Sequence, residues 1–197
     1  IHGGTQDKKN DCPSFRVLLD VFRYKIKFPN QVHIILGNHD TAFITNSDVL
    51  KNGKEMNKLM RNALKLRYEE NFEMVIDAIR DTFLSLPLAV KCENGLWLSH
   101  SLPANRYLEQ FGTDIFEREL VKGDFIKPGS VYLLTWGRKQ KPQTLEKLSE
   151  MLDAKFFLLG HQPNPQGWDY LGENAIIITS EHNQGCIVKL DLSTECS

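Results

Sequence analysis

The chain has 197 residues, of which 41% are hydrophobic and 25% are charged, and its formal net charge is −1. This balance predicts one soluble globular domain over residues 1–197. With no long block of Lys or Arg, it argues against a nucleic-acid partner. The apolar runs have only the length of strands, so no membrane-spanning helix or membrane partner is expected, and four scattered cysteines without a CxxC pair suit a reducing, cytoplasmic setting.

The first half of the chain is predicted to be mainly helical. Apolar residues recur at helical spacing over residues 14–28, and Pro29-Asn30 ends this helix. Residues 32–36 predict a buried strand that leads into a polar loop. Two more helices are predicted, a polar one over 46–70 and a more apolar one over 71–84.

The second half is predicted to be richer in strands. A hairpin is expected around Glu93-Asn94-Gly95, and one or two short helices are expected over 104–120. An amphipathic helix is predicted over 143–152. The remaining runs predict strands over 88–92, 96–100, 131–135, 155–159, 167–171, 175–180 and 186–192. The chain is therefore expected to have an α/β fold of mixed layers.

Three of the predicted strands end in polar residues that include a histidine. These ends are Gly37-Asn38-His39-Asp40, Ser99-His100-Ser101 and Gly160-His161-Gln162. Catalytic groups of α/β proteins gather at the carboxyl ends of strands, and three such ends in a chain with six histidines predict one shared site. The alternative for a single end is structural, because Gly-Asn is a common turn pair and His-Asp can cap a helix.

The residue types at these ends suit a metal and proton transfer. One amide oxygen with two imidazole nitrogens suits a borderline ion such as Mn, Fe or Zn, and the lack of thiolates argues against structural zinc. A histidine titrates near neutral pH and can protonate a leaving group. Paired metals are a common means of hydrolysing phosphate esters, although two ions need more carboxylates than these ends provide.

These motifs resemble those of the calcineurin-like metallophosphoesterases, and within them the phosphoprotein phosphatase branch that includes serine/threonine protein phosphatases. Residues 37–40 are similar to the GNH[E/D] motif, His100 within 97–103 to the single-histidine motif, and residues 160–162 to the final histidine motif. Residues 24–30 and 83–89 are also similar to protein phosphatase sequence. The resemblance covers roughly residues 14–192.

The resemblance implies a β-sandwich of two mixed sheets flanked by helices, with the site at the strand ends. It implies that Asn38, His100 and His161 bind one metal of a pair of Mn and/or Fe ions, with Zn as an alternative. It implies that His39 protonates the leaving group and that Asp40 helps to fix the loop and keep His39 charged. Activated water would attack phosphorus in line, without a covalent phosphoenzyme.

The chain departs from the family pattern at several places. The Asp-x-His motif and the aspartate of Gly-Asp-x-x-Asp-Arg-Gly are absent, so the beginning of the domain is expected to lie outside this chain. Ile1–Gly4 resembles either the tail of the second motif or a remnant of the first. The loop after Trp136 is short and basic, and Arg138 is a candidate phosphate-binding residue or simply part of a solvated loop. With the compact loop 180–185, this indicates a bacterial-type or divergent member.

The leading hypothesis is two-metal hydrolysis of phosphate monoesters, with phosphoserine and phosphothreonine in proteins as plausible substrates. One alternative is a hydrolase of dinucleoside polyphosphates. An alternative of another class is a degenerate, non-catalytic scaffold that keeps the fold. The expected partner is a phosphorylated substrate, and the residues do not indicate an oligomeric state.

Overall fold

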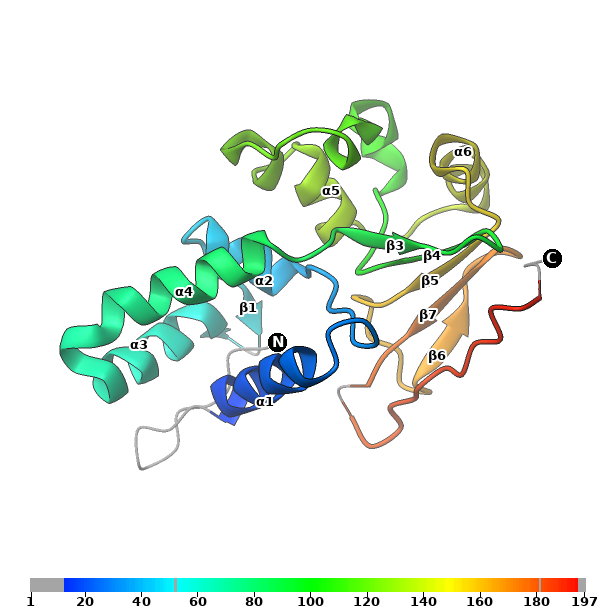
Figure 1. Cartoon of the computed structure of the whole chain (residues 1–197). Helices are drawn as coiled ribbons and strands as arrows, with labels where there is room; N and C mark the ends of the chain where they lie inside the picture. The colour runs from blue at the N-terminus through cyan, green and yellow to red at the C-terminus, as the bar shows by residue number, and fades with distance from the viewer. Residues whose placement is uncertain (1–12, 52, 181, 195–197) are drawn as a thin grey trace. The chain divides into compact units, whose positions relative to one another are not determined.

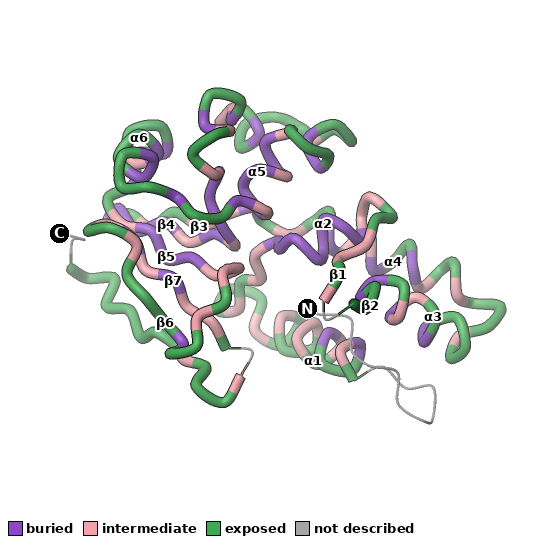
Figure 2. Tube along the Cα trace, turned by 180° about the vertical axis from the view of Figure 1, so that it is seen from behind, coloured by how far each residue is buried: buried purple, intermediate pink, exposed green. Residues whose placement is uncertain are grey.

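The computed structural model describes residues 13–51, 53–180 and 182–194 (Figures 1 and 2). Contacts divide the chain into two compact units. The first unit comprises residues 1–34 and 39–86, and the second comprises residues 35–38 and 87–197. The prediction that residues 1–197 form one domain stays a prediction.

The first unit is mainly helical, as its sequence predicted. The helices expected over 14–28 and 71–84 are confirmed as α1 and α4, with boundaries that shift by only one residue. The described elements are α1 (Pro13–Lys27), α2 (Asn38–Ile44), β1 (Leu50–Lys51), β2 (Lys54–Glu55), α3 (Met56–Tyr68), the 3₁₀ turn η1 (Glu69–Asn71) and α4 (Phe72–Leu84).

Aromatic side chains join the helices of the first unit. The ring of Phe83 in α4 meets Phe22 of α1 edge-on at 6.5 Å and Phe43 of α2 at 5.5 Å between centroids. Arg61 of α3 lies 4.1 Å over the ring of Phe43 and donates a 2.8 Å hydrogen bond to its carbonyl oxygen. Burial lowers the pKa of Arg61, and the contact with the ring face offsets part of this desolvation cost. The core of this unit therefore draws on all four helices.

The prediction of a helix over residues 46–70 is wrong in part. The helix expected over 46–70 begins only at Met56, because Leu50–Lys51 and Lys54–Glu55 pair as the antiparallel strands β1 and β2. The Asp48 carboxylate sets this start by accepting hydrogen bonds from the backbone N–H groups of Asn57 and Lys58, at 2.9 and 2.8 Å. An acidic side chain well before the helix in sequence thus caps it.

The strand expected over residues 32–36 is not formed. In the part of the chain that the structure describes, the Val32 N–H bonds to Phe28 and the Leu36 N–H bonds to Pro87, and no strand pairs along the segment. An apolar run of this length forms a strand only where a neighbouring strand supplies a ladder of backbone partners.

The second unit is built on a five-stranded mixed sheet with the order β3-β4-β5-β7-β6. The three central strands are parallel, and the two outer strands are antiparallel to their neighbours. Burial is deepest in the centre, as Figure 2 shows, and Phe157 of β5 is fully buried. The strands are β3 (Ala89–Lys91), β4 (Leu96–Ser99), β5 (Phe156–Leu159), β6 (Trp168–Tyr170) and β7 (Ala175–Ile178).

Helices α5 and α6 lie on the same side of this sheet in Figure 1. In α6, Leu145 and Leu148 are fully buried, as the predicted amphipathic pattern requires. The short helices expected over 104–120 are 3₁₀ turns. The described helices of this unit are η2 (Asn105–Gln110), η3 (Thr113–Phe116), η4 (Lys122–Phe125), α5 (Ser130–Trp136) and α6 (Pro142–Leu152).

Two strand predictions for the second unit are wrong. Residues 131–135 belong to helix α5, in which Tyr132 and Trp136 stack at i, i+4 with ring centroids 5.4 Å apart. A short apolar run cannot be assigned to strand or buried helix from its pattern alone. Residues 186–192 form no strand, although the Cys186 N–H donates a 3.1 Å bond to the Thr179 carbonyl oxygen.

The predicted α/β class is confirmed, since helices accompany the five-stranded mixed sheet and the two-stranded β1–β2 sheet. The strands expected around residues 88–92, 96–100, 155–159, 167–171 and 175–180 are present with shorter boundaries. None of the described helices has both the length and the apolar character needed to span a membrane.

A buried carboxylate in the second unit gives a test of its stability. Asp124 is 7% exposed and accepts two 2.8 Å hydrogen bonds from the guanidinium of Arg118 and one from the Val121 N–H. The bonds from Arg118 lower the pKa of Asp124 below its ordinary value of about 3.9. Because the folded-state pKa is lowered, this stabilisation is complete above the ordinary value and is lost as the pH falls through the folded-state pKa.

We expect Asp124→Asn to lower the thermal unfolding midpoint by about 2–4 °C at neutral pH, with the deficit shrinking as the solution is acidified below about pH 4. Asp114→Asn is the matched control, because Asp114 also accepts a bond from Arg118 but is exposed. Its effect should be smaller. Equal losses in the two variants, or a deficit that does not change with pH, would contradict this account.

Candidate metal centre

Two neighbouring parallel strands bring two of the predicted histidines together. Ser99 at the end of β4 lies opposite Leu159 at the end of β5. His100 follows the first strand directly, and His161 follows the second after Gly160. The N–H of Gly160 donates a 3.2 Å bond to the carbonyl oxygen of His100, which extends the pairing past the strand ends. Both imidazoles therefore project from one edge of the sheet.

Asn38 joins the two histidines through the segment 35–38 of the second unit. The N–H of Leu36 donates a 3.0 Å bond to the carbonyl oxygen of Pro87, just before β3. The Oδ1 atom of the buried Asn38 then lies 2.9 Å from Nε2 of His100, which in turn lies 3.1 Å from Nδ1 of His161. The structure thus gathers the three residues predicted to share a cation.

The backbone of His161 adopts an uncommon conformation. Its φ is +66°, in the left-handed region that side chains other than Gly and Asn rarely occupy. A Cβ added at Gly160 would make only ordinary contacts, at 3.7 Å or more. The backbone therefore turns at His161 itself rather than at the preceding glycine. Strain of this kind is characteristic of functional sites.

The contact with Arg138 determines which nitrogen of His161 carries the proton. Arg138 donates from Nε to Nε2 of His161 at 3.0 Å, and because a guanidinium accepts no hydrogen bond, Nε2 must offer its lone pair. In a neutral ring the proton then lies on Nδ1 and points to Nε2 of His100. That Nε2 also lies 2.9 Å from Oδ1 of Asn38, so three atoms that can bind a cation follow one another at hydrogen-bond distance.

The distances between successive donor atoms suit neighbouring ligands of a cation. Two ligands at right angles around a cation, with bonds of about 2.1 Å, lie about 3.0 Å apart, close to the observed 2.9 and 3.1 Å. Among the described residues, however, no three His, Cys, Asp or Glu side chains gather around a common point. The cluster has two imidazoles and one amide, and no carboxylate joins it within the described part of the chain. The predicted motif remnant Ile1–Gly4 lies outside the described residues.

Arg138 is held beside His161 by a fixed loop. Gly137 packs so closely on residue Leu102 that a Cβ there would clash with its carbonyl oxygen. The Ser101 hydroxyl donates a 2.6 Å bond to the Gly137 carbonyl, and the buried Gln140 amide donates to the Leu102 carbonyl. These contacts tie the loop after α5 to the segment that follows His100.

Gln162 completes this arrangement from the other side. Its Oε1 accepts a 3.0 Å bond from the Lys139 N–H, and its Nε2 donates a 3.1 Å bond to Oε1 of Gln140. Sequence reasoning quoted Gln162 only as part of a motif and gave Gln140 no role. No signal in the sequence indicated this role, because the two glutamines lie 22 residues apart and meet only in the folded chain.

His39 and Asp40 lie in the first turn of α2, where a loop was expected, so that part of the prediction is wrong. Both residues are buried, at 8% exposure each, and an acidic residue suits the first turn of a helix. The buried Asn57 donates 3.3 Å bonds from Nδ2 to the carbonyl oxygens of His39 and Ser47. Asn57 thus secures the start of α2, a role that its sequence position did not indicate.

Comparison with known proteins agrees with the motifs. The model of the family described as calcineurin-like phosphoesterase matches residues 1–185. The chain belongs to this family. The resemblance drawn from the strand-end motifs is therefore confirmed, and a search of curated proteins finds no match.

A solved structure shares the fold. It is a protein serine/threonine phosphatase from Saccharomyces cerevisiae with similarity to human phosphatase PP5, and it superimposes with a TM-score of 0.63 at 19% sequence identity. The match covers 87% of this chain and 54% of that structure's chain. At this identity the likeness shows the fold, and the chain spans about half of the length of that relative.

The close approach of Gly137 to Leu102 gives a test of the loop. We expect Gly137→Ala to lower the free energy of unfolding by about 1–3 kcal/mol, since the new methyl group has to push backbone apart. Gly123→Ala is the control, because a Cβ there meets no atom within 4 Å. Urea unfolding of both variants measures the difference. A stability of Gly137→Ala equal to that of the control would contradict the packing described.

Proposed function

We propose that this chain carries part of the active site of a metal-dependent phosphatase that hydrolyses phosphate monoesters, phosphoserine and phosphothreonine among them. The supporting observation is the convergence of Asn38, His100 and His161, with 2.9 and 3.1 Å between successive donor atoms. Membership of the calcineurin-like phosphoesterase family supports phosphoester chemistry at this place.

Asn38 would hold a metal through Oδ1, His100 through Nε2 and His161 through Nδ1. The mixed oxygen and nitrogen donors favour Mn or Fe, with Zn as an alternative. When bound, a pair of such ions supplies Lewis acidity, which activates water and neutralises the charge of the phosphate. The second ion depends on ligands beyond these three residues.

Arg138 would bind the oxygens of the phosphate group that is hydrolysed. When His161 gives Nδ1 to a cation, its proton lies on Nε2, which can then no longer accept the bond from Arg138. The guanidinium would thus be released beside the cluster, where it can form a forked pair of bonds with phosphate oxygens. The loop contacts of Gly137 and Gln140 keep it within reach.

His39 would donate a proton to the leaving oxygen, and Asp40 would favour the protonated imidazole through its charge. This role rests on the sequence motif, because His39 follows Asn38 directly in the chain. The tie between Asn57 and the His39 carbonyl oxygen supports a fixed backbone at this residue.

We expect His39→Ala to lower turnover of an alkyl phosphate by about 10²- to 10⁴-fold while leaving metal content unchanged, since a general acid contributes about that much. The loss should be much smaller with 4-nitrophenyl phosphate, whose leaving group needs little protonation. Steady-state rates with both substrates and metal analysis make the test. An unchanged rate with the alkyl phosphate would remove the acid role.

His100→Ala and His161→Ala should lose bound metal as well as activity, because each deletes a proposed ligand. The exposed His33 provides the control, and His33→Ala should keep both. Metal per chain is measured by elemental analysis after purification. Stoichiometric metal in the two ligand variants would contradict the assignment, and a wild-type protein that never binds stoichiometric metal would favour the non-catalytic scaffold.

A further inference from the structure

A pocket in the second unit is lined by cations and aromatic rings. Its volume is about 520 Å³. Among the described residues that line it, the charged side chains are all basic, namely Arg106, Lys127, Arg138 and Lys139. A concave surface of one sign concentrates ligands of the opposite charge. The lining therefore favours an anionic ligand.

Two of these cations share one aromatic ring. The guanidinium carbon of Arg106 lies 4.8 Å from the ring centre of Tyr107, and Nζ of Lys127 lies 5.1 Å from it. The negative face of the ring stabilises each cation, and the hydrogen bond from Lys127 is the main cause of a lowered pKa at Tyr107. Both cations lie about 5 Å from the same ring centre, so an anion bound beside this ring would be attracted by both charges.

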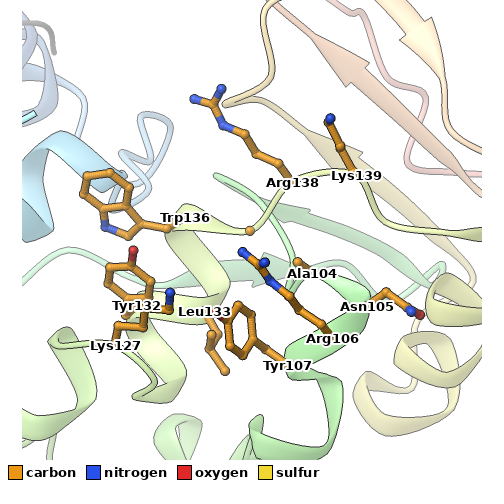
Figure 3. Close-up of a pocket in the computed structure, with 11 residues that line it drawn as sticks. Ala104, Asn105, Arg106, Tyr107, Lys127, Tyr132, Leu133, Trp136, Arg138 and Lys139 are labelled. Atoms are coloured by element: carbon orange, nitrogen blue, oxygen red, sulfur yellow. The ribbon is translucent and has the colours of Figure 1, made fainter. Parts of the chain in front are cut away.

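An aromatic pair also lines the pocket. Tyr132 and Trp136 of α5 stack with an interplanar angle of 10°. In Figure 3, Arg138 and Lys139 extend away from this pair. The stacked rings offer a flat, apolar surface on which the carbon skeleton of a ligand can lie.

Arg138 connects the pocket to the metal-binding cluster. It lines the pocket and also donates to Nε2 of His161. A phosphate bound at the cluster beside Arg138 would therefore lie at the border of this pocket. A single ligand with two anionic groups can use both places.

We propose that Arg106 and Lys127 bind a second phosphate group of the substrate while the first is held for hydrolysis. The substrate class is then a phosphate monoester whose leaving group carries another phosphate. A phosphate fits better than a carboxylate because it has more charge and enough oxygens for a guanidinium and an ammonium together. This inference rests on the proposed function, which it refines.

Binding of non-hydrolysable ligands tests the pocket without relying on catalysis. Calorimetry would compare alkane bisphosphonates of increasing spacer length with alkyl monophosphonates of the same length. We expect the best bisphosphonate to bind at least about tenfold more tightly than its monophosphonate. The double variant Arg106→Gln with Lys127→Gln should abolish this preference.

A matched control variant removes two exposed lysines that do not line the pocket, Lys122→Gln with Lys147→Gln. It has the same change in net charge and should keep the preference. The proposal is overturned if the wild-type protein shows no preference at any spacer length. It is equally overturned if both double variants behave alike.

Hydrolysis separates this proposal from the proposed function. With alkanediol bisphosphates and alkyl phosphates as substrates, the ratio of kcat/KM should favour the bisphosphate by at least about tenfold and fall to near one in Arg106→Gln with Lys127→Gln. Equal turnover of both substrates would contradict the second phosphate subsite but would support the proposed phosphatase activity. If neither substrate is hydrolysed, the proposed activity is contradicted, and the binding measurements still test the second phosphate subsite. An equal gain from an ω-carboxyalkyl phosphate would overturn the assignment to phosphate.

Discussion

The parallel pairing of β4 with β5 determines where the chemistry of this chain can lie. With Ser99 opposite Leu159, the residues just past the two strands must emerge at one edge of the sheet. The bond from the Gly160 N–H to the His100 carbonyl carries this alignment one step further. A shift of β5 by one residue against β4 would turn each of its side chains to the other face of the sheet. Burial of Phe157 therefore helps to fix the register, and with it the position of the imidazoles.

The helix α5 connects this edge with the basic pocket. Its stacked Tyr132 and Trp136 form the wall, and its end at Trp136 places Gly137 against the backbone of Leu102. These contacts restrain the turn that follows, and Arg138 in this turn donates a hydrogen bond to His161. Had residues 131–135 formed a strand, neither the wall nor this turn would exist in the same place. One helix therefore supports both the proposed metal site and the proposed phosphate subsite.

Sequence patterns sufficed where the cause was local. The hairpin around Asn94 and the helices α1 and α4 follow from turn chemistry and periodicity. The three predicted motifs led to the residues that meet, although the segment before Asn38 forms no strand. Distant partners decided what was missed. The start of α3 depends on the Asp48 carboxylate, and the fixed position of Arg138 depends on Gln140, whose neighbours are brought together only by the fold. The short apolar run 131–135 suits a strand and a buried helix equally well, so the sequence alone could not identify it as part of α5.

The left-handed backbone at His161 places folding and ligand binding in opposition. Glycine or asparagine would relax the main chain there, yet either would delete the imidazole nitrogen that is proposed to bind the metal. Laboratory selection for thermal stability alone should therefore favour glycine or asparagine at position 161, and the selected proteins should be more stable but lack the proposed metal ligand. Conversely, a related chain that keeps histidine at this position despite its positive φ would be expected to use the proposed site.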